Sequence, residues 1–168
     1  AGLVVVVLGA AIGLIAWYWC LFVGWGQCTA AGAPIVSSHT MAAYRMPVTS
    51  GEWQWQHADG KSAAVFAGSK VTVICDLAER TITIGRRGDV VDATAVVVLT
   101  SAQSRTFSGR NTGGQIVVTL PAHDAFLDSI AFSRGRLAID VAGLEAIYPP
   151  SWAEVSRVVE DCRAPSAP

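Results

Sequence analysis

Charged side chains are absent from the first quarter of this sequence. No Asp, Glu, Lys or Arg occurs from Ala1 to Tyr44, so the 12 basic and 13 acidic residues all lie from Arg45 onward. Charged residues make up 15% of the chain, whereas soluble domains average roughly 25%. The deficit is therefore local: an apolar N-terminal part precedes a normally charged remainder, which is long enough to bury a core of its own.

Patterns that carry catalytic or metal chemistry are also missing. The chain has 3 histidines, and neither G-x-S-x-G nor S-x-x-K is present to supply an activated nucleophile. No Cys or His pair has the spacing of zinc ligands, and the glycine-rich stretch Ser108–Gly114 lacks the P-loop lysine. We therefore expect no enzyme activity, no metal and no cofactor. An active site of unfamiliar pattern is the alternative.

A basic surface of the kind that binds nucleic acid is missing as well. The net charge is −1 and the basic residues are dispersed along the second part of the chain, so we expect no nucleic-acid partner. Arg134 and Arg136 flank Gly135 behind a predicted helix, a position that suits either a bound anion or a solvated helix end.

What the N-terminal part does contain is one long apolar run. Leu3–Val23 is apolar apart from glycines, Tyr18 and Cys20, and about 20 such residues span the hydrocarbon core of a bilayer. We predict a transmembrane anchor helix over residues 1–25, in contact with the lipid bilayer. Its end carries aromatic side chains typical of a membrane interface, which could instead touch a pigment or a quinone: Trp17, Tyr18, Trp19, Phe22 and Trp25.

The flanks of this run predict its orientation. No Lys or Arg follows it until Arg45, so the positive-inside rule places the C-terminal flank on the translocated side. We expect a single-pass protein of the bacterial inner membrane with its C-terminal domain in the periplasm. Ala31–Ala33 resembles a signal-peptidase site, but the apolar run exceeds the roughly 7–15 residues of a signal peptide, so we predict that the anchor is not cleaved.

Gly9 and Gly13 form a small-xxx-small pair within the anchor. Such a pair lets a second helix approach closely, which favours integral membrane protein subunits as partners. Ordinary glycine usage in membrane helices is the alternative interpretation.

The rest of the chain divides into an extended tether (26–50), a β-rich domain (51–164) and a disordered tail (165–168). We predict a mainly-β domain, an antiparallel sheet or sandwich, with one or two short helices. Alternating or β-branched runs predict strands at 53–56, 71–75, 81–84, 93–99, 105–108, 115–120, 137–141 and 144–148. Gly109–Gly114 is predicted as a turn.

Two helices are predicted, at His123–Ser133 and at the C-terminus. Ser151–Glu154 has the pattern of a capping box. The side chains after it recur at helical spacing and predict one buried stripe: Trp152, Val155, Val159 and Cys162.

The chain has 4 cysteines, of which Cys75 and Cys162 both face the predicted core. In an oxidising compartment we expect them to form a disulfide, which would constrain the unfolded chain by roughly 4–5 kcal/mol. Two buried free thiols are the alternative. Cys20 and Cys28 are separated by roughly 12 Å of helical rise, too far to bridge.

Two segments resemble the C-terminal signature of uncharacterised cell-envelope proteins of alphaproteobacteria. They are Ala131–Arg136 and the run from Pro150-Ser151-Trp152 to Glu160-Asp161-Cys162-Arg163. The similarity extends back to Trp53 and includes Cys75-Asp76, but not the predicted anchor. It implies an envelope location and paired cysteines, and it carries no known activity.

Two functions fit these features. The first is a non-catalytic accessory subunit of an inner-membrane assembly, with the helix docked in the membrane and the β-domain covering the periplasmic face. The second is a free-standing, membrane-tethered binding module that uses Trp53 and Trp55 as its contact surface.

Overall fold

The computed structural model describes residues 45–165. The chain falls into two units, Ala1–Ile35 and Val36–Pro168, and only the second contains described residues. The predictions for the anchor, for Gly9 and Gly13, for the interfacial aromatic cluster and for most of the tether therefore lie outside the described residues. Within residues 45–165, no helix is long and apolar enough to cross a membrane.

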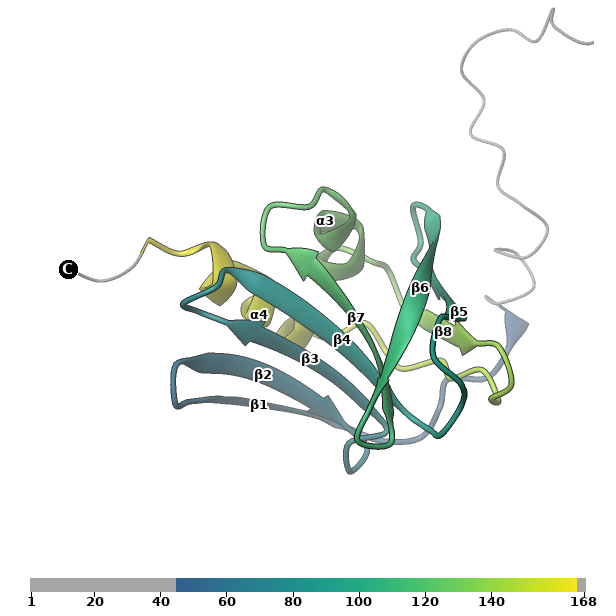
Figure 1. The fold of residues 1–168 in the computed structure, drawn as a ribbon. Coiled ribbons are helices and arrows are strands. Elements are labelled where there is room, and N and C mark those ends of the chain that lie inside the picture. Colours follow the sequence, from purple (N-terminus) through teal and green to yellow (C-terminus); the bar gives the residue numbers. More distant parts are fainter. Residues whose placement is uncertain (1–44, 166–168) are drawn as a thin grey trace, which may run out of the picture. The chain divides into compact units, whose positions relative to one another are not determined.

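Eight antiparallel strands form one sheet in the order β1-β2-β3-β4-β7-β6-β5-β8 (Figure 1). The prediction of a mainly-β, antiparallel fold is confirmed. Most strands pair with their neighbours in the chain, and only β7 and β8 are inserted out of order. The strands are β1 Trp53–Ala58, β2 Lys61–Phe66, β3 Val71–Asp76, β4 Thr81–Arg87, β5 Thr94–Leu99, β6 Ser104–Thr112, β7 Gln115–Pro121 and β8 Ala138–Val141.

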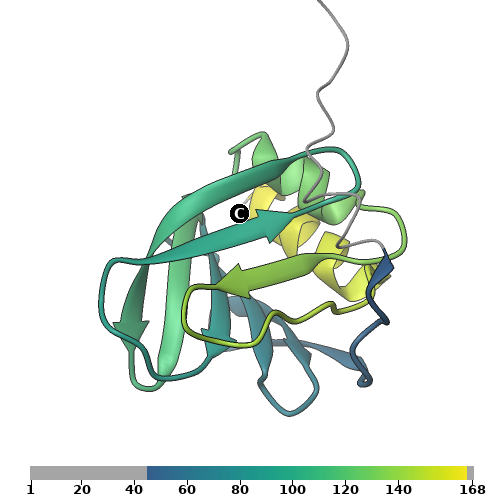
Figure 2. The same ribbon diagram turned by 90° about the vertical axis from the view of Figure 1, so that its right-hand side faces the viewer.

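Strand β6 joins the two sections of the sheet. Its first residues pair with β5, and Arg110–Thr112 pair with β7. The strand crosses at Gly109, where a Cβ atom would lie 2.5 Å from Ile116 Cγ2 and 2.6 Å from Val96 Cγ2. Only glycine fits this crossing, which lets the sheet curl around one core (Figure 2). The predicted turn at Gly109–Gly114 is therefore wrong in extent, since the turn itself is confined to Gly113 and Gly114.

Two further strand predictions need correction. The sequence pattern does not predict strand β2, because its Ser62-Ala63-Ala64 run is buried on both faces and does not alternate. The strand predicted at 144–148 reduces to one bridge between Ile139 and Ile147.

The two helices are α3 Phe126–Ala131 and α4 Ala153–Arg163. Helix α3 is shorter than predicted, because the chain becomes helical only after Asp124, whose Oδ1 accepts the N–H of Phe126 at 2.8 Å. This backbone hydrogen bond is the main cause that lowers the pKa of Asp124, and Arg105 contributes.

Helix α4 lies across one face of β1–β4 (Figure 1). Its buried side chains are Val155, Val158, Val159 and Cys162. The predicted capping box is wrong: the N-cap is Trp152, and no side chain caps the helix. The prediction that Trp152 lies on the buried stripe is also wrong, since 43% of its surface is exposed.

The predicted disulfide is present. Cys75 on β3 and Cys162 on α4 are joined with a Cα–Cα distance of 5.6 Å and a sequence separation of 87. Both residues are fully buried, so the bond fastens the C-terminal helix to the centre of the sheet from inside the core.

Removal of this bond should lower stability by roughly 4 kcal/mol, because the unfolded chain regains the freedom of a long loop. In a Cys20→Ser/Cys28→Ser background, Cys75→Ala/Cys162→Ala should unfold at a lower denaturant concentration than its parent. Reductant should shift the parent toward the same midpoint and leave the double alanine variant unchanged. Equal midpoints for all these samples would contradict the role assigned to the bond.

Candidate functional site

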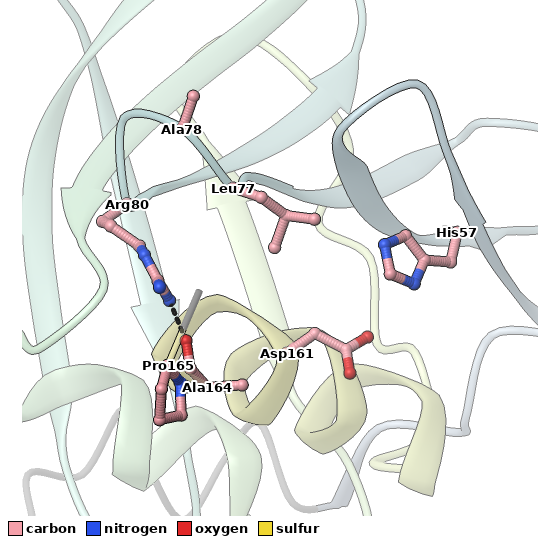
Figure 3. Close-up of a pocket in the computed structure, with 7 residues that line it drawn as sticks. All are labelled: His57, Leu77, Ala78, Arg80, Asp161, Ala164 and Pro165. Carbon is pink, nitrogen blue, oxygen red and sulfur yellow. Dashed lines mark hydrogen bonds between the residues drawn. The ribbon is translucent and has the colours of Figure 1, made fainter. Parts of the chain in front are cut away.

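An open pocket of about 450 Å³ lies at the C-terminal end of α4 (Figure 3). Its walls come from β1, from the turn between β3 and β4, and from the end of the helix. The lining residues are His57, Leu77, Ala78, Arg80, Asp161, Ala164 and Pro165.

The β3–β4 turn is shaped by the side chain of Asp76. Its Oδ1 accepts the backbone N–H groups of Ala78 and Glu79, each at 3.1 Å, as Asp commonly does at a turn. Arg80 closes the turn with a φ of 53°. The turn thereby holds Leu77, Ala78 and Arg80 at the edge of the pocket.

Arg80 contacts the end of α4. Its Nη1 donates to the carbonyl oxygen of Cys162 at 2.7 Å and also to that of Ala164. A cation at this end complements the helix dipole and satisfies carbonyls that lack helical partners. The guanidinium group therefore helps to terminate the helix. The Arg80 side chain extends from the β3–β4 turn to the end of α4 and forms part of the pocket wall (Figure 3).

Asp161 is the carboxylate of the pocket, and a network beneath it fixes its position. Its Oδ2 accepts the hydroxyl of Ser62 at 2.5 Å and the indole N–H of Trp55 at 3.2 Å. Ser62 is fully buried. The guanidinium carbon of Arg157 lies 3.8 Å from the centre of the Trp55 ring, a cation–π contact.

This arrangement can bind a small group but does not activate a nucleophile at Ser62. The His57 ring and the Asp161 carboxylate face one another across the pocket (Figure 3), where a polar ligand could contact both. Ser62 is enclosed, and its hydroxyl donates a hydrogen bond directly to Asp161, with no histidine between them. Among residues 45–165, no cluster of three or more His, Cys, Asp or Glu side chains is placed to hold a metal ion.

The two tryptophans predicted as a contact surface occupy different environments. Trp53 is 5% exposed, its indole N–H donates to the carbonyl of Pro150 at 2.8 Å, and its ring lies 5.2 Å from that of Phe66. Trp55 is half-buried beneath Arg157. Alternation in β1 predicts that both rings share a face, and that face is the one α4 covers, so they form no open aromatic platform.

No protein-family model, curated protein or solved structure matches this chain. Its function is therefore inferred from its own residues and geometry. The sequence pointed to neither Asp161 nor His57 as pocket residues, because they come together only when α4 packs on β1. The nearest signal was the Ser-Trp to Cys-Arg run that contains Asp161.

The network beneath the pocket should contribute to folding. Asp161→Asn keeps the shape of the side chain but removes the charge of the carboxylate, whose Oδ2 accepts two hydrogen bonds. We therefore expect a loss of about 1–3 kcal/mol in the free energy of unfolding. Glu160→Gln, at an exposed neighbouring position on the same helix, should change stability by less than about 0.5 kcal/mol. Denaturant titration measures both. Equal stability of the two variants would show that the Asp161 network is dispensable.

Proposed function

We propose that this chain is a non-catalytic accessory subunit of a larger inner-membrane protein assembly. Its N-terminal helix docks among integral membrane subunits, and its β-domain covers the periplasmic face. Single-helix subunits of this kind occur in respiratory and photosynthetic complexes, so by analogy an energy-transducing assembly is the class we favour.

The observation that carries this proposal is the way the end of the tether is built into the domain. The N–H of Thr49 donates to the carbonyl of Tyr148 at 2.9 Å, and the N–H of Tyr148 donates to Thr49 Oγ1 at 2.9 Å. The uncharged N-terminal stretch ends only a few residues earlier, at Tyr44. The end of the tether is thereby fixed to the domain, so an anchor over residues 1–25 would keep the domain near the membrane, as a subunit of a membrane assembly must be.

The alternative function is a free-standing, membrane-tethered binding module for a ligand or an envelope polymer. The pocket between His57 and Asp161 is the observation that favours it. Against it, Trp53 is buried, and the groups around Asp161 already hydrogen-bond to one another. We therefore rank the module second.

Mild-detergent extraction from native membranes, followed by a native gel and mass spectrometry, tests the proposal. The full chain with a C-terminal tag should migrate in one large complex of fixed stoichiometry, together with integral membrane proteins. Gly9→Leu/Gly13→Leu should weaken this association, because leucine blocks close helix approach. Ala11→Leu, on the opposite side of the predicted helix at 3.6 residues per turn, is the matched control.

A chain that migrates alone would overturn the accessory-subunit proposal. The binding-module alternative would then be tested by a ligand screen on the full chain, with Asp161→Asn as the variant that alters the pocket. The co-migrating proteins, if present, identify the assembly.

A further inference from the structure

The exposed apolar side chains of the domain gather mainly on one face. Five large apolar residues among those described are exposed, and only Val91 lies elsewhere. The other four are Phe132 at 72%, Met46 at 46%, and Val48 and Trp152 at 43% each. We call the surface formed by these four residues, together with Arg45 and Arg134, the tether face.

Backbone hydrogen bonds bring three distant segments together on the tether face. Residues 45–50 are joined to the segment before α4 by the bonds between Thr49 and Tyr148. The N–H of Ser151 donates to the carbonyl of Gly135 at 3.1 Å, so the start of α4 lies beside the loop that follows α3. Figure 2 shows these segments along the right-hand side of the domain.

The charges around these apolar residues are mainly basic. Arg45 and Arg134 are exposed, and neither side chain makes a hydrogen bond or ion pair within the described residues. Arg136 is half-buried nearby, and its Nη1 is buried without a hydrogen-bond partner in the part of the chain described. Glu154, half-buried in the first turn of α4, is the acidic residue closest to Trp152 in sequence. The tether face is thus more basic than the chain as a whole, whose net charge is −1.

The chain that leaves this face leads into the apolar N-terminal segment. All 44 residues before Arg45 are uncharged apart from any protonation of His39, and Leu3–Val23 is long enough to span a bilayer. If the anchor of the proposed function is correct, the tether face is the side of the domain closest along the chain to the membrane. Exposed aromatic side chains flanked by arginines are typical of surfaces that lie at the headgroup layer.

We propose that the tether face docks on anionic phospholipid headgroups of the membrane in which the chain is anchored. Phe132 and Trp152 insert among the headgroups, and Arg45 and Arg134 contact lipid phosphates. This inference rests on the anchor of the proposed function, but it does not require any partner protein. Each basic residue near an anionic membrane strengthens binding by about fivefold, so a surface with two exposed arginines distinguishes anionic from neutral lipid.

Hydrogen–deuterium exchange of the full chain in nanodiscs tests the proposal. Discs of phosphatidylcholine with added phosphatidylglycerol should slow exchange of the backbone amides at 45–50, 132–136 and 151–153, relative to phosphatidylcholine alone. High salt should reverse the protection, because it screens exposed charges. Phe132→Ser/Arg134→Glu should reduce the slowing of amide exchange by anionic discs by about tenfold or more. The variant loses one basic residue and gains a negative charge, which the anionic lipid repels.

Val91→Ser/Arg87→Glu is the matched control, because it makes the same kinds of change at an exposed apolar residue and an exposed arginine outside the tether face. This variant should keep the wild-type protection. Equal exchange in the two kinds of disc, or equal protection in both double variants, would overturn lipid docking. Protection found only in native membranes would identify the face as a protein interface instead. None of these results affects the accessory-subunit proposal, which depends on co-migration of the chain with membrane subunits.

Discussion

The described domain depends on the packing of α4 across β1–β4. The sheet alone would expose the core side of its central strands, and a helix of 11 residues is not stable alone in water. Each therefore requires the other, and the Cys75–Cys162 bond fastens them where both are fully buried. Hydrogen bonds add to the contact between helix and sheet at its edge. Asp161 accepts from Ser62 and Trp55, and Arg80 donates to the last carbonyls of the helix. The polar groups of the pocket are thus largely engaged in holding the helix.

Local patterns predicted those parts of the fold that local physics determines. The β-branched runs on either side of the turn at Asp76–Arg80 became β3 and β4, and the two inward-facing cysteines formed a disulfide. Features that depend on distant partners were missed. Strand β2 is covered on both faces and does not alternate. Gly109 is required where β6 crosses between its two partner strands, and this requirement comes from the side chains of Val96 and Ile116. Trp152 is exposed because Ser151 is still held in an extended segment by its hydrogen bond to Gly135.

The candidate sites show the same division. The sequence indicated that Trp53 and Trp55 share a face, but only the position of α4 determines that this face is covered. His57 and Asp161 lie far apart in sequence and meet only across the pocket. The tether face is assembled from three segments, none of which has an unusual composition by itself. Surfaces made by tertiary packing leave little local signal, whereas the absence of charge before Arg45 is visible in the sequence alone.

The central claim is that the domain is held in a fixed position against a membrane assembly. Lys61 and Lys70, the two lysines of the chain, lie at the turns at opposite ends of β2 (Figure 1) and provide two reference points. Cross-linking of intact cells with a lysine-reactive reagent, followed by mass spectrometry, measures what lies near them. The account predicts links from these lysines to one recurring set of integral membrane proteins. Links to many envelope proteins in proportion to their abundance would contradict it.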